Sequence, residues 1–137
     1  MSILKKSIFT IAFFSLCIHS FAQANMQFVS EYIKLDSLYI EDVFTVCKAY
    51  YTNTGDAPLY LTGYKSFCPC VEAEFSEEPL VPGDTTFVTL TFTFSHDGSF
   101  RHPVFFSYFS DKDDEDPKKT VTIYGVVNEK REEEIGQ

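Results

Sequence analysis

Two turn motifs with a cysteine pair between them constrain the fold of this chain more than any other feature of its sequence. The first turn spans residues 53–59, the cysteines are Cys68 and Cys70, and the second turn contains Pro82-Gly83. In the first turn, Asn53 can hydrogen-bond the backbone two residues on, while glycine tolerates positive φ and proline pushes its predecessor into an extended conformation. Residues typical of strands flank both turns, so the sequence predicts short strands joined by tight reversals.

The clearest predicted strand is residues 85–95, where Val88, Leu90, Phe92 and Phe94 alternate mainly with threonines. A period of two indicates a strand with one buried face and one solvated face. No segment shows a sustained helical period. We therefore expect an all-β, immunoglobulin-like sandwich of two antiparallel sheets with about seven strands. The other predicted strands are residues 27–32, 43–52, 59–67, 103–109 and 120–127.

The N-terminal residues have the pattern of an export signal. Lys5 and Lys6 precede an apolar run over residues 8–18, and small residues follow at Ser20, Ala22 and Ala24. This order is typical of a secretory signal peptide, and the run is too short for a membrane span, which needs about 20 apolar residues. We predict that residues 1–22 are removed, with cleavage after Ala24 as the alternative. The mature protein is then expected in a periplasmic or extracellular location.

The mature chain has the size of one domain and is strongly acidic. We expect the sandwich to occupy residues 23–127, followed by a charged tail over residues 128–137. Loss of the two signal lysines changes the formal net charge from -9 to -11, with 9 Lys and Arg against 20 Asp and Glu. Nucleic acids and anionic membranes require cationic side chains to neutralise phosphate, so the sequence argues against both partners.

The cysteines leave several pairings open. The mature chain has three of them, an odd number, so at least one is a free thiol or pairs between molecules. Cys47 lies in phase with Ala49 and Tyr51, which favours a buried small hydrophobe. An extended chain places residues i and i+2 about 6.6 Å apart, at the far edge of the range for a disulfide. We rank a Cys68–Cys70 bridge or a free thiol pair ahead of a bridge to Cys47.

Metal binding by Cys68 and Cys70 is the alternative hypothesis. Two soft thiolates suit Cu(I), whereas a structural zinc site needs four ligands. Only Cys47, His96 and His102 remain to complete such a site, and nothing in their spacing brings them to the pair. The sequence therefore favours a structural pair and no metal or other cofactor.

The remaining polar motifs do not indicate an enzyme. No serine, histidine and acid arrangement has recognisable context, Gly-x-Ser-x-Gly is absent, and no helix follows the cysteines as in thiol oxidoreductases. The acidic run over residues 111–117 begins like a calcium loop, but Asp116 replaces the turn glycine and Thr122 the final glutamate. We interpret this run as a solvated hairpin loop.

Outward aromatic residues favour a binding function. If Val104, Phe106 and Tyr108 face inward, Phe105 and Phe109 face outward, and Phe87 begins the outward face of the threonine-rich strand. Aromatic side chains exposed together mark partner sites. We predict a noncatalytic interaction module in which Phe87, Phe105 and Phe109 contribute to a surface for a protein or glycan partner. On the last strand, glycine shares the inward face with Val121, Ile123 and Val127, which indicates a bulky neighbour close by at Gly125.

Taken together, these motifs resemble the bacterial domain of unknown function family 1573. The matching segments are residues 51–59, Cys68-Pro69-Cys70, 79–83, 98–100 and 125–127. The resemblance covers about residues 28–127, and it implies an immunoglobulin-like fold, related to domains of cilia-associated and major-sperm-type proteins, and an exported location. The family's activity is not established. Pro69 stands where the family usually has glycine, so we expect a stiffer loop here.

Overall fold

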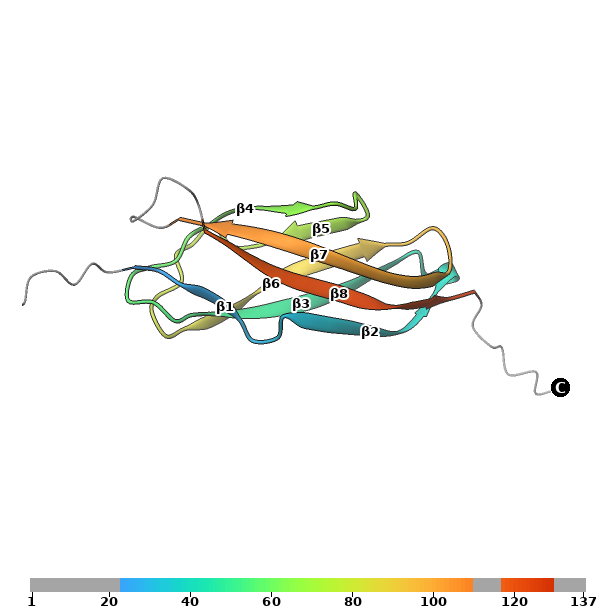
Figure 1. The fold of residues 1–137 in the computed structure, drawn as a ribbon, viewed down its shortest axis with the longest axis horizontal. Helices are drawn as coiled ribbons and strands as arrows, with labels where there is room; N and C mark the ends of the chain where they lie inside the picture. The colour runs from blue at the N-terminus through green and yellow to red at the C-terminus, as the bar shows by residue number, and fades with distance from the viewer. Residues whose placement is uncertain (1–22, 110–116, 130–137) are drawn as a thin grey trace, which may run out of the picture.

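The computed structural model describes residues 23–109 and 117–129. The predicted signal peptide, most of the acidic run and most of the predicted tail lie outside this part of the chain. The described residues form eight strands and one short 3-10 turn, Ile40–Asp42 (Figure 1). The strands are β1 Met26–Phe28, β2 Tyr32–Tyr39, β3 Phe44–Asn53, β4 Leu61–Ser66, β5 Val71–Glu74, β6 Thr85–Thr93, β7 Gly98–Tyr108 and β8 Lys118–Asn128.

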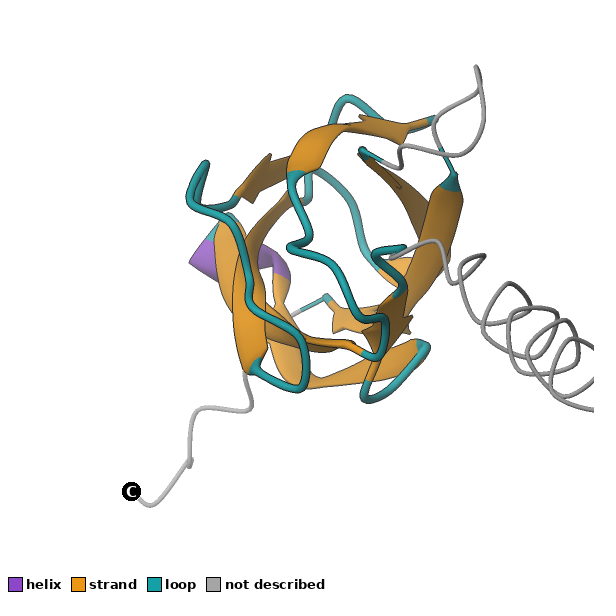
Figure 2. Cartoon of the chain, turned by 90° about the vertical axis from the view of Figure 1, so that its left-hand side faces the viewer, coloured by secondary structure: helices purple, strands orange, loops and turns teal. Residues whose placement is uncertain are grey.

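The strands form two four-stranded sheets that pack face to face, as predicted. The first sheet has the order β1-β3-β6-β5, and the second has the order β2-β8-β7-β4. Seen end on, the strands of both sheets surround the interior (Figure 2). One pair differs from the prediction, because β2 runs parallel to β8 whereas every other described pair is antiparallel. No helix in the described residues is long and apolar enough to cross a membrane.

The single strand predicted over residues 27–32 is wrong. The chain forms β1 in the first sheet, leaves it after Phe28, and enters the second sheet as β2 at Tyr32. Strand β2 escaped prediction because its register shifts between Leu35 and Leu38, where Ser37 has a positive φ of 58°. A bulge of this kind breaks the period of two on which the prediction relies. The short strand β5 was also missed.

The core lies between the two inner faces and confirms the predicted phases of the long strands. On β6, Val88 and Leu90 are fully buried and Phe92 is 3% exposed. Phe106 of β7 is also fully buried and packs edge to face against Phe28, at a ring-centroid distance of 5.7 Å. Burial of large apolar side chains from both sheets is the main favourable term that holds such a sandwich together.

The first turn is organised by the buried side chain of Asn53. Its Oδ1 accepts hydrogen bonds from the backbone N–H of Gly55 (3.0 Å) and Asn25 (3.3 Å). Its Nδ2 donates to the carbonyl oxygens of Ala57 (2.7 Å) and Leu80 (2.9 Å). The predicted bond to the backbone two residues on is therefore present. The same side chain also ties β1 and the second turn to the end of β3.

Candidate functional site

The outer face of the second sheet carries cations in an otherwise acidic chain. Alternation along β2, β4, β7 and β8 directs four basic side chains to this face. Asp36 is the one carboxylate at an outward strand position among the described residues of this sheet, and it lies 3.6 Å from Lys34 Nζ. Aromatic side chains lie between the cations. We call this surface the basic aromatic face, formed by Tyr32, Lys34, Lys65, Phe67, Arg101, Phe105, Lys118 and Tyr124.

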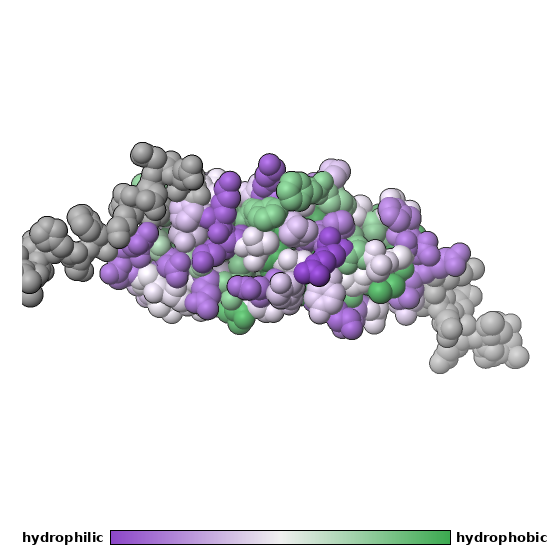
Figure 3. All heavy atoms as spheres, viewed as in Figure 1, coloured by the Kyte–Doolittle hydropathy of each residue, from purple (hydrophilic) through white to green (hydrophobic). Residues whose placement is uncertain are grey.

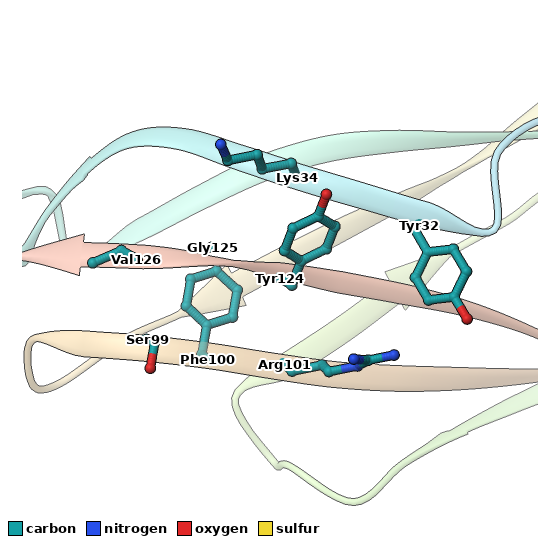
Figure 4. Close-up of a pocket in the computed structure, with 8 residues that line it drawn as sticks. All are labelled: Tyr32, Lys34, Ser99, Phe100, Arg101, Tyr124, Gly125 and Val126. Carbon is teal, nitrogen blue, oxygen red and sulfur yellow. The ribbon is translucent and has the colours of Figure 1, made fainter.

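One half of the basic aromatic face is a shallow hollow across β2, β8 and β7. It has a volume of about 640 Å³, and Tyr32, Lys34, Arg101 and Tyr124 are among its lining residues (Figure 4). The guanidinium carbon of Arg101 lies 5.6 Å from the centre of the Tyr32 ring, within the range of a cation–π contact. Tyr32 is 57% exposed, so its ring remains available to a ligand.

The other half lies where β4 meets β7. Phe67 and Phe105 pack edge to face with ring centroids 5.6 Å apart, and Lys65 Nζ lies 5.8 Å from the Phe67 ring centre. Lys118 lines the same hollow, which has a volume of about 540 Å³. Phe67 is 74% exposed, the largest exposed fraction of any large hydrophobic residue in the described chain. Exposed aromatic rings are enriched at contact surfaces, whereas the lysines beside them supply local positive charge.

The three aromatic residues predicted as one partner surface do not come together. Phe87 is on the outer face of the first sheet, where it packs against Tyr50 and lies 4.3 Å from Lys48 Nζ. Phe105 is on the opposite outer face, and Phe109 follows β7 with 49% exposure. Only Phe105 belongs to the basic aromatic face. Lys34 was missed because β2 was not predicted, and Arg101 and Lys118 lie outside the strands predicted over residues 103–109 and 120–127. The outward phase of Tyr124 was readable in the sequence.

Apolar side chains lie between strongly hydrophilic ones on the face in view in Figure 3. Such a mixture differs from the continuous apolar patch that marks an obligate interface.

The second group of interest is the cysteine pair. Cys68 and Cys70 form a disulfide, with their Cα atoms 5.1 Å apart. This spacing is shorter than that of a fully extended chain because the two residues lie in a turn between β4 and β5. Cys47 is a free thiol on β3 that packs against the core, and burial raises the pKa of this thiol above its ordinary value of 9.0. The predicted order of pairings agrees with this arrangement, whereas Cys47 is half-buried at the edge of the core and not fully buried as predicted.

His102 lies beside the disulfide, a contact that we did not predict. Its Nε2 is 3.7 Å from Cys70 Sγ. The ring is stacked on Phe100, with centroids 5.7 Å apart, and it also contacts Phe92 at 5.3 Å. Burial lowers the pKa of His102 below its ordinary value of 6.5. His102 shares the inward face of β7 with Val104, and the packing of the two sheets brings its ring to the cysteine turn.

The backbone holds the cysteine turn against β6. Thr93 N–H donates to the carbonyl oxygen of Cys70 at 2.8 Å, and Val71 N–H donates to that of Cys68 at 3.3 Å. The turn borders a hollow of about 530 Å³ at the end of the sandwich, which His96 and His102 also line. His96 is exposed and lies 3.3 Å from Ser95 Oγ through its Nδ1. Among the described residues, the group that could hold a metal ion is Cys68, Cys70 and His102.

Comparison with known proteins identifies the family. A family model described as "Protein of unknown function (DUF1573)" matches residues 26–127. The match covers most of the chain, and the protein belongs to this family. No curated protein matches the sequence.

Solved structures share the fold. The seventh ASH or PapD-like domain of human CEP192 is 10% identical, with a TM-score of 0.64, and the match covers 84% of this chain and 93% of that domain. The VesB protease of Vibrio cholerae is 12% identical, with a TM-score of 0.58, over 76% of this chain and 32% of that one. A Porphyromonas gingivalis W83 protein of unknown function is 16% identical, with a TM-score of 0.57, over 76% of this chain and 47% of that one. These likenesses establish the immunoglobulin-like, PapD-like fold.

Proposed function

We propose that this member of the DUF1573 family is an exported, noncatalytic interaction module that binds an acidic protein partner on its basic aromatic face. The observation that carries the proposal is the separation of charge. A chain with a net charge of -9 places Lys34, Lys65, Arg101 and Lys118 on one outer face, against Asp36 among the described strand residues. This local excess of positive charge favours a partner that presents carboxylates. The acidic remainder of the molecule repels the same carboxylates, so they are directed to this face.

The aromatic side chains support a protein partner. Tyr32, Phe67 and Tyr124 present broad rings at low cost in conformational entropy, and aromatic residues together with Arg dominate the energetics of protein interfaces. Arg101 is placed against the Tyr32 ring. This contact partly orders its side chain before a carboxylate arrives, so less entropy is lost on binding.

Export is the second part of the proposal, and it rests on the pattern of residues 1–22 together with the Cys68–Cys70 disulfide. Disulfides persist in oxidising compartments and are rare in reducing ones. N-terminal mass spectrometry of the natural protein tests this part. A mature chain that begins at Gln23 or Asn25 is the expected result, and retention of Lys5 and Lys6 would refute it.

Charge reversal on opposite faces tests the binding function. The natural protein is captured with its partners from an envelope extract of the producing cells, and the capture is repeated with Arg101→Glu and with Lys48→Glu. Lys48 is the matched control, because it is also an exposed cation beside an aromatic ring but lies on the outer face of the first sheet. We expect Arg101→Glu to abolish capture of a specific protein, and salt to weaken it, whereas Lys48→Glu has little effect.

Two outcomes contradict the proposal. Equal loss in both variants would show that overall charge, and not the basic aromatic face, controls binding. Retention of a glycan by both the natural protein and Arg101→Glu, without dependence on salt, would replace the acidic protein with a sugar ligand. Circular dichroism of both variants confirms that each is folded before capture.

A further inference from the structure

The cysteine turn and β7 bring three metal-binding atoms together at the end of the sandwich. The Sγ atoms of Cys68 and Cys70 and a ring nitrogen of His102 all lie within 4.8 Å of one another. The cysteines lie in the turn that joins β4 of the second sheet to β5 of the first, and the histidine lies on β7 of the second sheet. In the disulfide form both sulfur atoms are bonded to each other. They become thiolate ligands only when that bond is broken.

The spacing fits a shared metal ion. Metal–sulfur and metal–nitrogen bonds of about 2.3 and 2.1 Å, separated by 120°, place the two ligand atoms about 3.8 Å apart. The distance from Cys70 Sγ to His102 Nε2 is 3.7 Å. One ion therefore fits between these two atoms with β7 and the backbone of the cysteine turn in place, once breakage of the disulfide lets the two sulfurs separate. Cys68, two residues away in the same turn, is placed to supply the third bond.

The surroundings fix the ligands in place. Cys70 is tied to β6 through the hydrogen bond from Thr93 N–H to its carbonyl oxygen. The His102 ring packs against both Phe92 and Phe100, which are stacked on each other with centroids 4.5 Å apart. Ligands restrained in this way lose little entropy on binding a metal, and an apolar surround limits access of water to the ion.

The ligand set selects the kind of metal. Two thiolates and one imidazole form a soft, three-atom set, which suits Cu(I). A structural zinc site requires four protein ligands, and the described residues supply three here.

We propose that reduction of the Cys68–Cys70 disulfide creates a Cu(I) site in which Cys68, Cys70 and His102 are the three ligands. The reductant is a dithiol, which gives up two electrons and two protons and becomes a disulfide itself. The Cys68–Cys70 bond breaks, and each sulfur takes one electron and one proton. When Cu(I) binds, the two thiol protons pass to solvent and the two thiolates bond to the ion. Exchange with a second disulfide reverses the change: the two thiolates give two electrons to that disulfide, which takes two protons and becomes a dithiol, and the ion loses both sulfur ligands.

Titration with Cu(I) tests the site. The protein is reduced with dithiothreitol, freed of reductant without oxygen, and titrated in competition with bathocuproine disulfonate, a coloured Cu(I) chelator. We expect one Cu(I) per reduced chain and none for the disulfide form. Loss of a group that only hydrogen-bonds a metal ligand already lowers metal affinity about tenfold or more. Loss of a ligand itself, in His102→Gln, should therefore weaken retention of Cu(I) by at least about tenfold. His96→Gln is the matched control, because His96 lines the same hollow outside the ligand cluster, and it should leave retention unchanged.

A second control removes the remaining thiol. Cys47→Ser should also leave the stoichiometry at one, whereas Cys68→Ser with Cys70→Ser should abolish binding. X-ray absorption of the copper-loaded natural protein gives a reading that does not depend on any variant folding, and two sulfurs with one nitrogen are expected.

Several results would overturn the proposal. Equal retention by His102→Gln and the natural protein would remove the histidine from the site. Three sulfurs in the absorption spectrum would do the same, and binding by the disulfide form would remove the redox requirement. Zinc held more tightly than Cu(I) by the reduced protein would overturn the choice of metal.

Discussion

Substitution of Asn53 tests whether one buried amide joins the N-terminal strand to both turns. Its side chain is fully buried and makes four hydrogen bonds, two as acceptor and two as donor. Each buried hydrogen bond contributes about 1 kcal/mol net, and more when its partner is left unsatisfied. Asn53→Ala removes all four bonds and takes this partner from two N–H groups and the Ala57 carbonyl, whereas the Leu80 carbonyl still accepts from Leu59 N–H. We therefore expect a loss of about 4 kcal/mol in the free energy of unfolding, a large part of the total stability of a typical domain.

Asn53→Asp separates the donor bonds from the acceptor bonds. An aspartate still accepts from Gly55 and Asn25, but it places a charged oxygen where Nδ2 donated to the carbonyls of Ala57 and Leu80. Repulsion from these carbonyls raises the pKa of the new carboxyl in the folded state, so protonation stabilises the fold relative to the unfolded chain. The deficit of Asn53→Asp relative to the natural protein should therefore be largest at neutral pH and shrink as the pH falls below the carboxyl pKa of the folded variant.

Urea unfolding followed by circular dichroism measures both variants. Asn128→Ala is the control, because Asn128 makes one side-chain hydrogen bond, to the carbonyl of Leu38 at 3.0 Å, from an exposed position. We expect this control to cost about 1 kcal/mol or less. A loss for Asn53→Ala no larger than that of the control would refute the reasoning, as would a deficit for Asn53→Asp that does not depend on pH.

Three further predictions concern the core, a close contact and the free thiol. Leu90→Ala should destabilise the domain by roughly 2 to 5 kcal/mol, whereas the neighbouring, outward Thr91→Ala should cost far less; similar losses in urea would contradict the assigned faces. Gly125→Ala should lower the free energy of unfolding by roughly 1 to 3 kcal/mol, because its new Cβ would lie 2.5 Å from the carbonyl oxygen of Leu35. Gly63→Ala is the control in the same assay, since a Cβ at Gly63 meets nothing within 4 Å. Burial raises the pKa of the Cys47 thiol, so the contribution of this thiol to stability is complete below the thiol pKa of the unfolded chain and is lost as the pH rises through the folded pKa. Because the thiolate is the reactive form, alkylation of Cys47 at pH 8 should be much slower in buffer than in urea. Equal rates of alkylation would contradict the raised pKa.

The regular strands were predictable because their burial follows one period. In β6 the apolar residues Val88, Leu90 and Phe92 all face inward. In β8 the glycine at position 125 lies where a bulky neighbour was expected, since an added Cβ would lie 3.2 Å from the Phe100 ring. Local chemistry also predicted the Asn53 turn, because the side chain acts within a few residues. Where alternation is regular, the identity of the residues is sufficient to assign a face.

The candidate sites were harder to predict because each depends on contacts between distant segments. Strand β2 has an irregular register around Ser37, so the pairing of Tyr32 with β8 and its contact with Arg101 could not be anticipated. The approach of His102 to Cys70 joins residues 32 positions apart in the sequence, one on β7 and the other in the turn before β5. Spacing along the chain carries no information about such a contact. Packing of the two layers determines it.

Strand β7 carries residues of both proposed sites, and its alternation makes them separable. Arg101 points out to the basic aromatic face, while the next residue, His102, points in to the cysteine turn. Because consecutive side chains of a strand lie on opposite sides of the sheet, a change at one need not alter the surroundings of the other. Arg101→Glu should therefore leave Cu(I) retention by the reduced protein unchanged, and His102→Gln should leave capture of the acidic partner unchanged. Loss of both properties in either variant would instead indicate a disturbed strand, and neither site could then be assigned from that variant.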